Sequence, residues 1–97
     1  MINMYTEKVI YWIDHHQYSR QHWETVAREI FEESQQDLSV AVPRLGFAIR
    51  SFHIKFQDGV IKVGNVLYDL IDLAYMNVDW DAVASHVYSN INQEENS

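Results

Sequence analysis

The segment LSVAVPRLGFAIRSFHIKFQDGVIKV, residues 38–63, decides the fold class because it is compatible with either a helix or a hairpin. Its apolar residues recur at alternating spacings of four and three, and a second apolar stripe repeats every seventh residue. The first stripe is Leu38, Val42, Leu45, Ile49, Phe52 and Phe56, and the second is Val40, Phe47 and Ile54. Both spacings are typical of a helix with neighbours on two sides. We therefore predict a helix over residues 41–57, with Pro43 in its first turn and Gly59 as its C-terminal stop.

The C-terminal part of this segment also fits a β-hairpin. Phe52, Ile54 and Phe56 alternate with polar residues, and Asp58-Gly59 is a strong hairpin turn. The residues that follow the turn, 60–63, are rich in β-branched side chains. A hairpin over residues 52–63 is thus the alternative. We favour the helix because the four-three spacing continues for longer than the alternation does.

Helical spacing on both sides of this segment predicts an all-α fold. A first helix is expected over residues 4–16, followed by a connection at Gln17-Tyr18 and a second helix capped by Ser19. A further helix is expected over about 65–76, and Asp79 is expected to cap the last one. The inner stripes are Trp23, Val26, Ala27, Ile30 and Phe31; Val66, Leu67, Leu70, Ile71 and Ala74; and Trp80, Val83, Val87 and Ile91. The prediction is a small bundle of four or five short helices.

Length and composition limit the function classes. The 97 residues suggest one domain spanning residues 1–97, with an acidic tail that frays from about residue 92. The formal charge of −7 argues against direct binding of nucleic acid or of anionic membranes. Cysteine is absent, which excludes disulfides and thiolate zinc sites and fits a reducing compartment. No apolar run is long enough for a signal peptide or a membrane span, so we expect a cytoplasmic protein.

The sequence carries no assembled catalytic motif. Its five histidines form no HExxH pair, and neither a serine-nucleophile motif nor a glycine-rich phosphate loop occurs. Asp14-His15-His16 resembles a signature of the DHH phosphoesterases, but the likeness covers three residues and the separate aspartate motifs of that family are missing. We therefore expect no enzymatic activity, no metal and no cofactor.

The aromatic residues fall into two groups. Trp12, Trp23 and Trp80 lie on predicted inner faces, where core packing is their expected role. Three tyrosines, Tyr68, Tyr75 and Tyr88, flank inner stripes, and we expect them to be half exposed. Half-exposed tyrosines suit a protein interface as well as the rim of a small core.

The charge distribution is asymmetric along the chain. Residues 63–97 contain neither lysine nor arginine, and their acids are Asp69, Asp72, Asp79, Asp81, Glu94 and Glu95. These acids are either a solvated surface or, together with Tyr68 and Tyr75, a surface that binds a partner. Such a partner would be a protein with a basic groove, for example a nucleic-acid-handling enzyme. In composition the chain is similar to phage-encoded DNA-mimic inhibitors of restriction or CRISPR enzymes, which implies an acidic inhibitor or adaptor of the anti-defence type.

The alternative function is self-association. The chain has more apolar stripe than one thin core needs, and the stripe at positions 40, 47 and 54 is a candidate contact. This alternative describes a structural or regulatory helical module that forms a homodimer.

Overall fold

The computed structural model describes residues 2–60, 64 and 66–95. In this part of the chain there are five helices and no strand: α1 (Met4–His15), α2 (Gln17–Glu33), α3 (Leu38–Val60), α4 (Val66–Met76) and α5 (Trp80–Glu95). The all-α prediction is confirmed. The hairpin alternative is wrong as far as it can be compared, because residues 52–60 belong to α3; its remaining residues, 61–63, lie outside the described residues.

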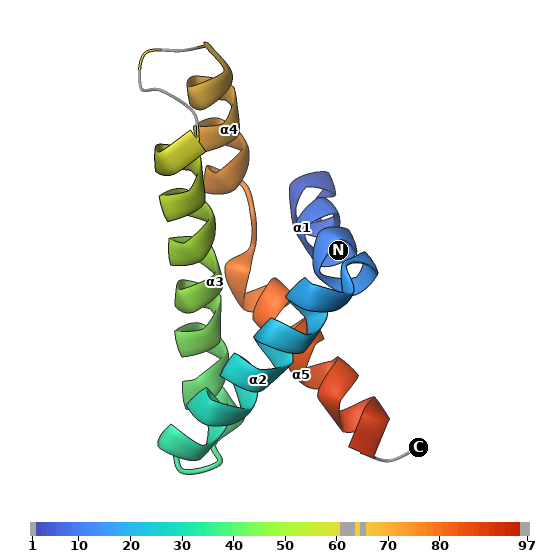
Figure 1. Cartoon of the computed structure of the whole chain (residues 1–97). Helices are drawn as coiled ribbons and strands as arrows, with labels where there is room; N and C mark the ends of the chain where they lie inside the picture. Colours follow the sequence, from blue (N-terminus) through green and yellow to red (C-terminus); the bar gives the residue numbers. More distant parts are fainter. Residues whose placement is uncertain (1, 61–63, 65, 96–97) are drawn as a thin grey trace.

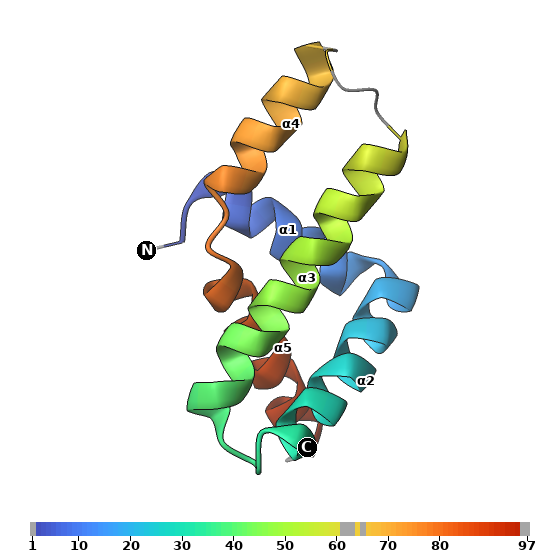
Figure 2. The ribbon, with the colours of Figure 1, turned by 90° about the vertical axis from the view of Figure 1, so that its left-hand side faces the viewer.

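The helices cross one another and leave one hairpin projecting from the body. In Figure 1, α3 stands upright, α4 runs back along its C-terminal half, and α2 and α5 cross beside its N-terminal half. Figure 2, turned by 90°, shows the tips of α3 and α4 extending beyond the other three helices. The resulting shape is elongated, with extents of 45 × 26 × 24 Å. None of the described helices is long and apolar enough to cross a membrane.

The core lies where α2, α3 and α5 meet. Its fully buried side chains come from the predicted stripes and include Ala27, Leu45, Ile49, Val83 and Val87. Helices α3 and α5 approach closely at Gly46, since a Cβ built there would lie 3.0 Å from the carbonyl oxygen of Trp80. Tyr88 is buried as well, and its hydroxyl donates to the carbonyl of Ala27 at 2.8 Å. The expectation that Tyr88 is half exposed was therefore wrong.

The junction of α1 and α2 is shorter than predicted. Only His16 separates the two helices, with extended backbone at φ −117° and ψ 103°. Helix α2 thus begins at Gln17, and Ser19 lies in its first turn rather than at its cap. The ring of His16 stacks on Trp12 and its Nδ1 donates to the Trp12 carbonyl at 2.9 Å. The carbonyl released at the end of α1 is satisfied in this way without a longer loop.

Helix α3 starts earlier than predicted. Gln35 and Gln36 both have positive φ, and their amides donate to the carbonyls of Glu32 and Phe31, which closes α2 with a Schellman-type turn. Asp37 then caps the next helix, because its Oδ1 accepts from the amide of Ser39 at 3.0 Å. Pro43 consequently lies beyond the first turn, inside the helix.

Helix α3 also ends later than predicted. It passes through Gly59, where a Cβ would meet nothing within 4 Å, and the positive φ of 91° belongs to Gly64 instead. Contacts with α4 account for the extension, since Gln57 is buried and its Nε2 donates to the carbonyl of Tyr68 at 3.0 Å. At the other end of the chain, the residues from 92 to Glu95, which we expected to form a frayed tail, belong to α5.

Candidate interaction surface

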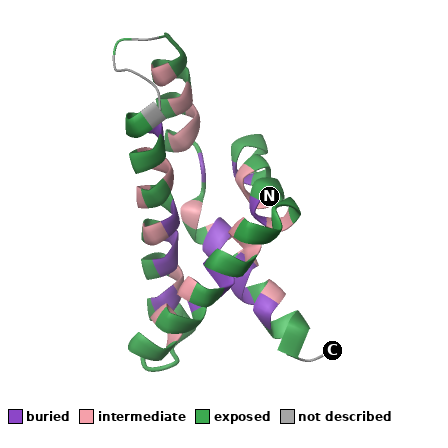
Figure 3. Cartoon of the chain, in the orientation of Figure 1, coloured by how far each residue is buried: buried purple, intermediate pink, exposed green. Residues whose placement is uncertain are grey.

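Helix α4 is the only helix in the described part of the chain without a buried residue. Figure 3 shows it entirely in the colours for exposed and half-buried residues. The apolar side chains that stay exposed are Val66, Leu67, Leu70, Leu73 and Met76, at 56–76% of their area. The prediction that Val66, Leu67 and Leu70 belong to an inner stripe was therefore wrong. Of that stripe, only Ile71 and Ala74 are half buried.

The exposed side chains of α4 form a second apolar side of the helix. At 100° per residue, Val66, Leu70 and Leu73 share one side, and Leu67 lies next to them. The half-buried Tyr68, Ile71 and Tyr75 form the other apolar side, and among the described helices α4 packs mainly against α3. We call the set Val66, Leu67, Leu70 and Leu73 the outer stripe. A helix that is apolar on two sides usually has two neighbours, and here the structure provides one.

Two hydrogen bonds join α4 to the end of α3. The Gln57 side chain donates to the Tyr68 carbonyl, and the Tyr68 hydroxyl donates to Oδ1 of Asp58 at 2.7 Å. The hydrogen bond to Asp58 raises the pKa of Tyr68 above its usual value, since the neutral phenol is the donor. These contacts hold the two helices together as an α3–α4 hairpin.

A groove of about 530 Å³ lies between this hairpin and α1. Its walls are apolar and aromatic: Trp12 comes from α1, Phe52 and Phe56 from α3, and Ala74 from α4. Trp12 and Phe56 are 59% and 62% exposed, so the prediction that Trp12 is a core residue was wrong. Lys8 is the only lysine or arginine among the lining residues, and none of the lining residues is acidic.

An aromatic cluster closes one end of the groove. The ring of His53 lies 5.8 Å from that of Tyr75, 5.6 Å from that of Trp80 and 5.5 Å from that of Phe52. Burial lowers the pKa of His53, so its neutral form is favoured at neutral pH. Its Nδ1 donates to the carbonyl of Ile49 at 2.8 Å. Burial also raises the pKa of Tyr75, which keeps this part of the wall uncharged.

All six acids proposed as a binding surface are exposed, and four of them lie on α4 and at the start of α5. Asp69 and Asp72 lie on the third side of α4, where Asp69 flanks the outer stripe beside Leu73 and Asp72 flanks Tyr68. Asp79 caps α5, because its Oδ1 accepts from the amide of Ala82 at 3.1 Å, as predicted. Asp81 follows in the first turn of α5, with Oδ1 close to Gly46. None of the ion pairs among the described residues involves these four acids.

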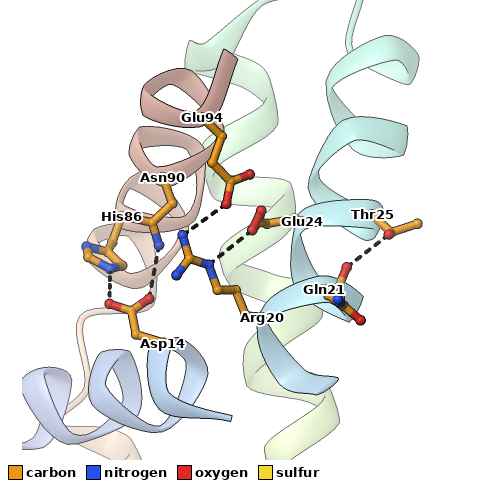
Figure 4. A network of polar contacts seen from close by, with 8 residues as sticks. All are labelled: Asp14, Arg20, Gln21, Glu24, Thr25, His86, Asn90 and Glu94. Atoms are coloured by element: carbon orange, nitrogen blue, oxygen red, sulfur yellow. Dashed lines mark hydrogen bonds and ion pairs between the residues drawn. The ribbon is translucent and has the colours of Figure 1, made fainter. Parts of the chain in front are cut away.

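The remaining two acids have partners on α2. Glu94 accepts from Nη2 of Arg20 at 3.0 Å, and Glu95 lies 4.0 Å from Nε of Arg28. Figure 4 shows Arg20 between Glu94 and Glu24. Burial raises the pKa of Glu24, and the neighbouring Glu94 raises it further. Glu94 and Glu95 thus help to attach the end of α5 to α2, and they are separated along α5 from Asp79 and Asp81.

Asp14 links α1 to α5 in the same view. Nε2 of His86 donates to Asp14 Oδ2 at 2.7 Å, and Nδ2 of Asn90 donates to Oδ1 at 3.0 Å (Figure 4). The rings of His15 and His16 instead donate to carbonyls of their own helix. Although Asp14, His15 and His16 are adjacent in sequence, they therefore form no common site.

Among the described residues, no three histidine, aspartate or glutamate side chains could hold one metal ion. A second, smaller hollow of about 290 Å³ lies between α2 and the end of α5, and its lining includes Arg28 and Glu95. Two of its charged groups, Arg28 and Glu95, form an ion pair between the two helices.

Comparisons with known proteins identify no relative. No family model matches the chain, and neither a curated protein nor a solved structure matches it significantly.

Proposed function

We propose that this protein is a non-enzymatic protein-binding module that works in the cytoplasm. Its interaction surface consists of the outer stripe of α4 and the adjoining groove. One observation carries the proposal: the outer stripe is 56–69% exposed and adjoins an apolar groove of about 530 Å³. Contiguous apolar surface of more than a few hundred Å² on a small protein is typical of interaction sites.

A macromolecular ligand fits this surface better than a small molecule does. The groove alone is in the size range of small-molecule pockets, roughly 300–1,000 Å³. The outer stripe, however, continues over eight residues of α4, residues 66–73, which is a rise of about 10 Å. Such ridges at spacings of three and four are the usual contacts of helix-in-groove recognition. The absence of cysteine agrees with function in a reducing compartment.

Site-specific photo-cross-linking in cells of the native organism tests this function. A benzophenone amino acid replaces Leu70 in one strain and Phe56 in a second, both of which are exposed. The matched control carries the same amino acid at Glu29, an exposed residue of α2 that lines neither hollow. Ultraviolet light should produce discrete protein adducts from positions 70 and 56 and none from position 29. Absence of adducts at both test positions would refute the proposal.

A second candidate is an acidic inhibitor or adaptor that occupies the basic groove of a nucleic-acid-handling protein. The observation in its favour is that Asp69, Asp72, Asp79 and Asp81 are exposed and outside the ion pairs of the described residues. Such an inhibitor would cover the partner's phosphate-binding lysines and arginines, in the manner of a DNA mimic. Glu94 and Glu95 contribute less to this candidate, since both have arginine partners.

Salt separates the second candidate from the first. Binding through acids should weaken steeply as salt rises, whereas binding through the outer stripe should not. Replacement of the four aspartates by asparagine should abolish capture of a basic partner. Replacement of Glu29 and Glu32 on α2 by glutamine is the matched control and should leave capture intact. Capture that resists salt and survives the aspartate changes would eliminate this candidate.

A further inference from the structure

We propose that the occupant of this surface is a second copy of the chain. The outer stripe of each α4 would enter the groove of the other copy, so that two α3–α4 hairpins pack across a twofold axis. The inference rests on the proposed function and names its partner. Three features of the chain support it: the ridge and groove are adjacent, the exposed apolar area is sufficient, and the charges are compatible.

The outer stripe, which forms a ridge on α4, and the groove lie side by side on one molecule. Ala74 and Tyr75 of α4 line the groove, and Leu67 and Leu70 precede Ala74 on the same side of the helix at i−7 and i−4. A twofold axis near this boundary places each ridge opposite the partner's groove, which is the geometry of an isologous contact. One helical turn is a cylinder about 10 Å wide and 5.4 Å long, on the order of 400 Å³. A groove of about 530 Å³ is therefore of the size that a helix face fills.

The exposed apolar area matches what a stable dimer buries. The side chains concerned are 50–69% exposed: Trp12, Phe52, Phe56, Val66, Leu67, Leu70 and Leu73. At roughly 100 Å² each, they offer on the order of 700–800 Å² on each copy. A standard interface buries about 800 Å² on each partner. The two hairpins, together with Trp12 of α1, thus supply enough apolar surface for association.

The charges of α4 suit the groove of its own chain. α4 carries Asp69 and Asp72 and no lysine or arginine, whereas the groove lining includes Lys8 and no acid. An apolar helix with acidic flanks is therefore a better match for this groove than a basic helix is. The total charge of −7 on each copy opposes association over longer distances. Added salt screens this repulsion, so the dimer should tighten or stay unchanged as salt rises.

Sedimentation equilibrium on the purified chain, from micromolar to near-millimolar concentration, tests the inference. The wild type should fit a monomer–dimer equilibrium that does not weaken in high salt. Leu70→Glu on the ridge and Trp12→Glu on the groove should each weaken the dimer by roughly 100-fold or more, because each buries an unpaired charge. Glu29→Gln on α2, an exposed position that lines neither hollow, is the matched control and should leave the dimer intact. Both glutamate substitutions replace exposed residues, so circular dichroism should show unchanged helicity.

Three results overturn the inference. They are a wild type that is monomeric throughout, a dimer that survives both glutamate substitutions, and a dimer that dissociates in high salt. The photo-cross-linking experiment separates these failures from failure of the proposed function. A monomeric protein that still forms adducts with another protein from positions 70 and 56 retains the function but binds a different partner. A monomeric protein without adducts loses both.

Discussion

Gly46 should tolerate no side chain, because the structure brings α3 and α5 into backbone contact at this point. A Cβ at position 46 would lie 3.0 Å from the Trp80 carbonyl oxygen and 3.1 Å from its carbonyl carbon. The nearby Asp81 Oδ1, also at 3.0 Å, is the end of an exposed side chain and can move, but the Trp80 backbone moves only with α5 itself. Gly46→Ala must therefore push the two helices apart.

The expected size follows from two opposing effects. Alanine is favoured over glycine in a helix interior by about 0.5–1 kcal/mol. Overpacking of a close contact typically costs about 1–3 kcal/mol. At mid-range values, the net effect of Gly46→Ala should be a loss of about 1 kcal/mol in the free energy of unfolding. For a domain of this size, that loss corresponds to a decrease in melting temperature of about 4–8 °C.

Urea denaturation followed by circular dichroism measures this difference at a fixed protein concentration. Gly59→Ala is the matched control, since it lies in the same helix and a Cβ there meets nothing within 4 Å. The control should be neutral or stabilising by up to about 1 kcal/mol. A Gly46→Ala protein as stable as the wild type, or more stable, would refute the close approach of α3 and α5.

Three further predictions concern single side chains. Tyr88→Phe removes the buried hydrogen bond to the Ala27 carbonyl and should lower the free energy of unfolding by about 1–2 kcal/mol; an unchanged urea midpoint would contradict this. Gln35→Gly should raise stability by up to about 1 kcal/mol, because Gln35 has a φ of 57° that glycine adopts without strain; a lower melting temperature would contradict it. Burial lowers the pKa of His53 in the folded state below 6.5, the ordinary pKa of histidine. As pH falls below 6.5, the unfolded chain therefore binds a proton at this residue more readily than the folded chain does, and the free energy of unfolding should decrease. The decrease between pH 7 and pH 5 should be smaller in His53→Gln, and identical pH profiles would show that His53 contributes none of it.

The sequence was sufficient to predict the helices, because each buried stripe repeats at helical spacing. The stripe from Leu45 to Ile49 lies in the core, as expected, and so do Val83 and Val87 of the last helix. The ends were less predictable where several local signals competed. Asp58-Gly59 is a strong turn signal, but α3 continues through it because contacts with α4 stabilise the helix.

The candidate site could not be predicted, because an apolar stripe does not specify which surface covers it. Val66 and Leu70 follow the same spacing as core residues, yet they are exposed, since α4 packs mainly against α3 with its opposite side. Trp12 of α1 was likewise predicted on an inner face, yet its side chain is exposed. The pairing of Glu94 with Arg20 could not be predicted from the sequence either, because the two residues are 74 positions apart and meet only in the folded chain. The buried position of Glu24 had no signal in the sequence for the same reason.

The most direct test of the central claim, that protein covers the outer stripe when the molecule works, is thiol alkylation in intact cells. The natural chain has no cysteine, so Leu70→Cys and Asp72→Cys each introduce a single reporter on the same helix. Both positions are exposed in the isolated chain. Our account predicts that a small permeable maleimide labels position 70 several-fold more slowly than position 72 in cells, and that both label equally fast in dilute purified protein. Equal labelling of the two positions in cells would contradict the account.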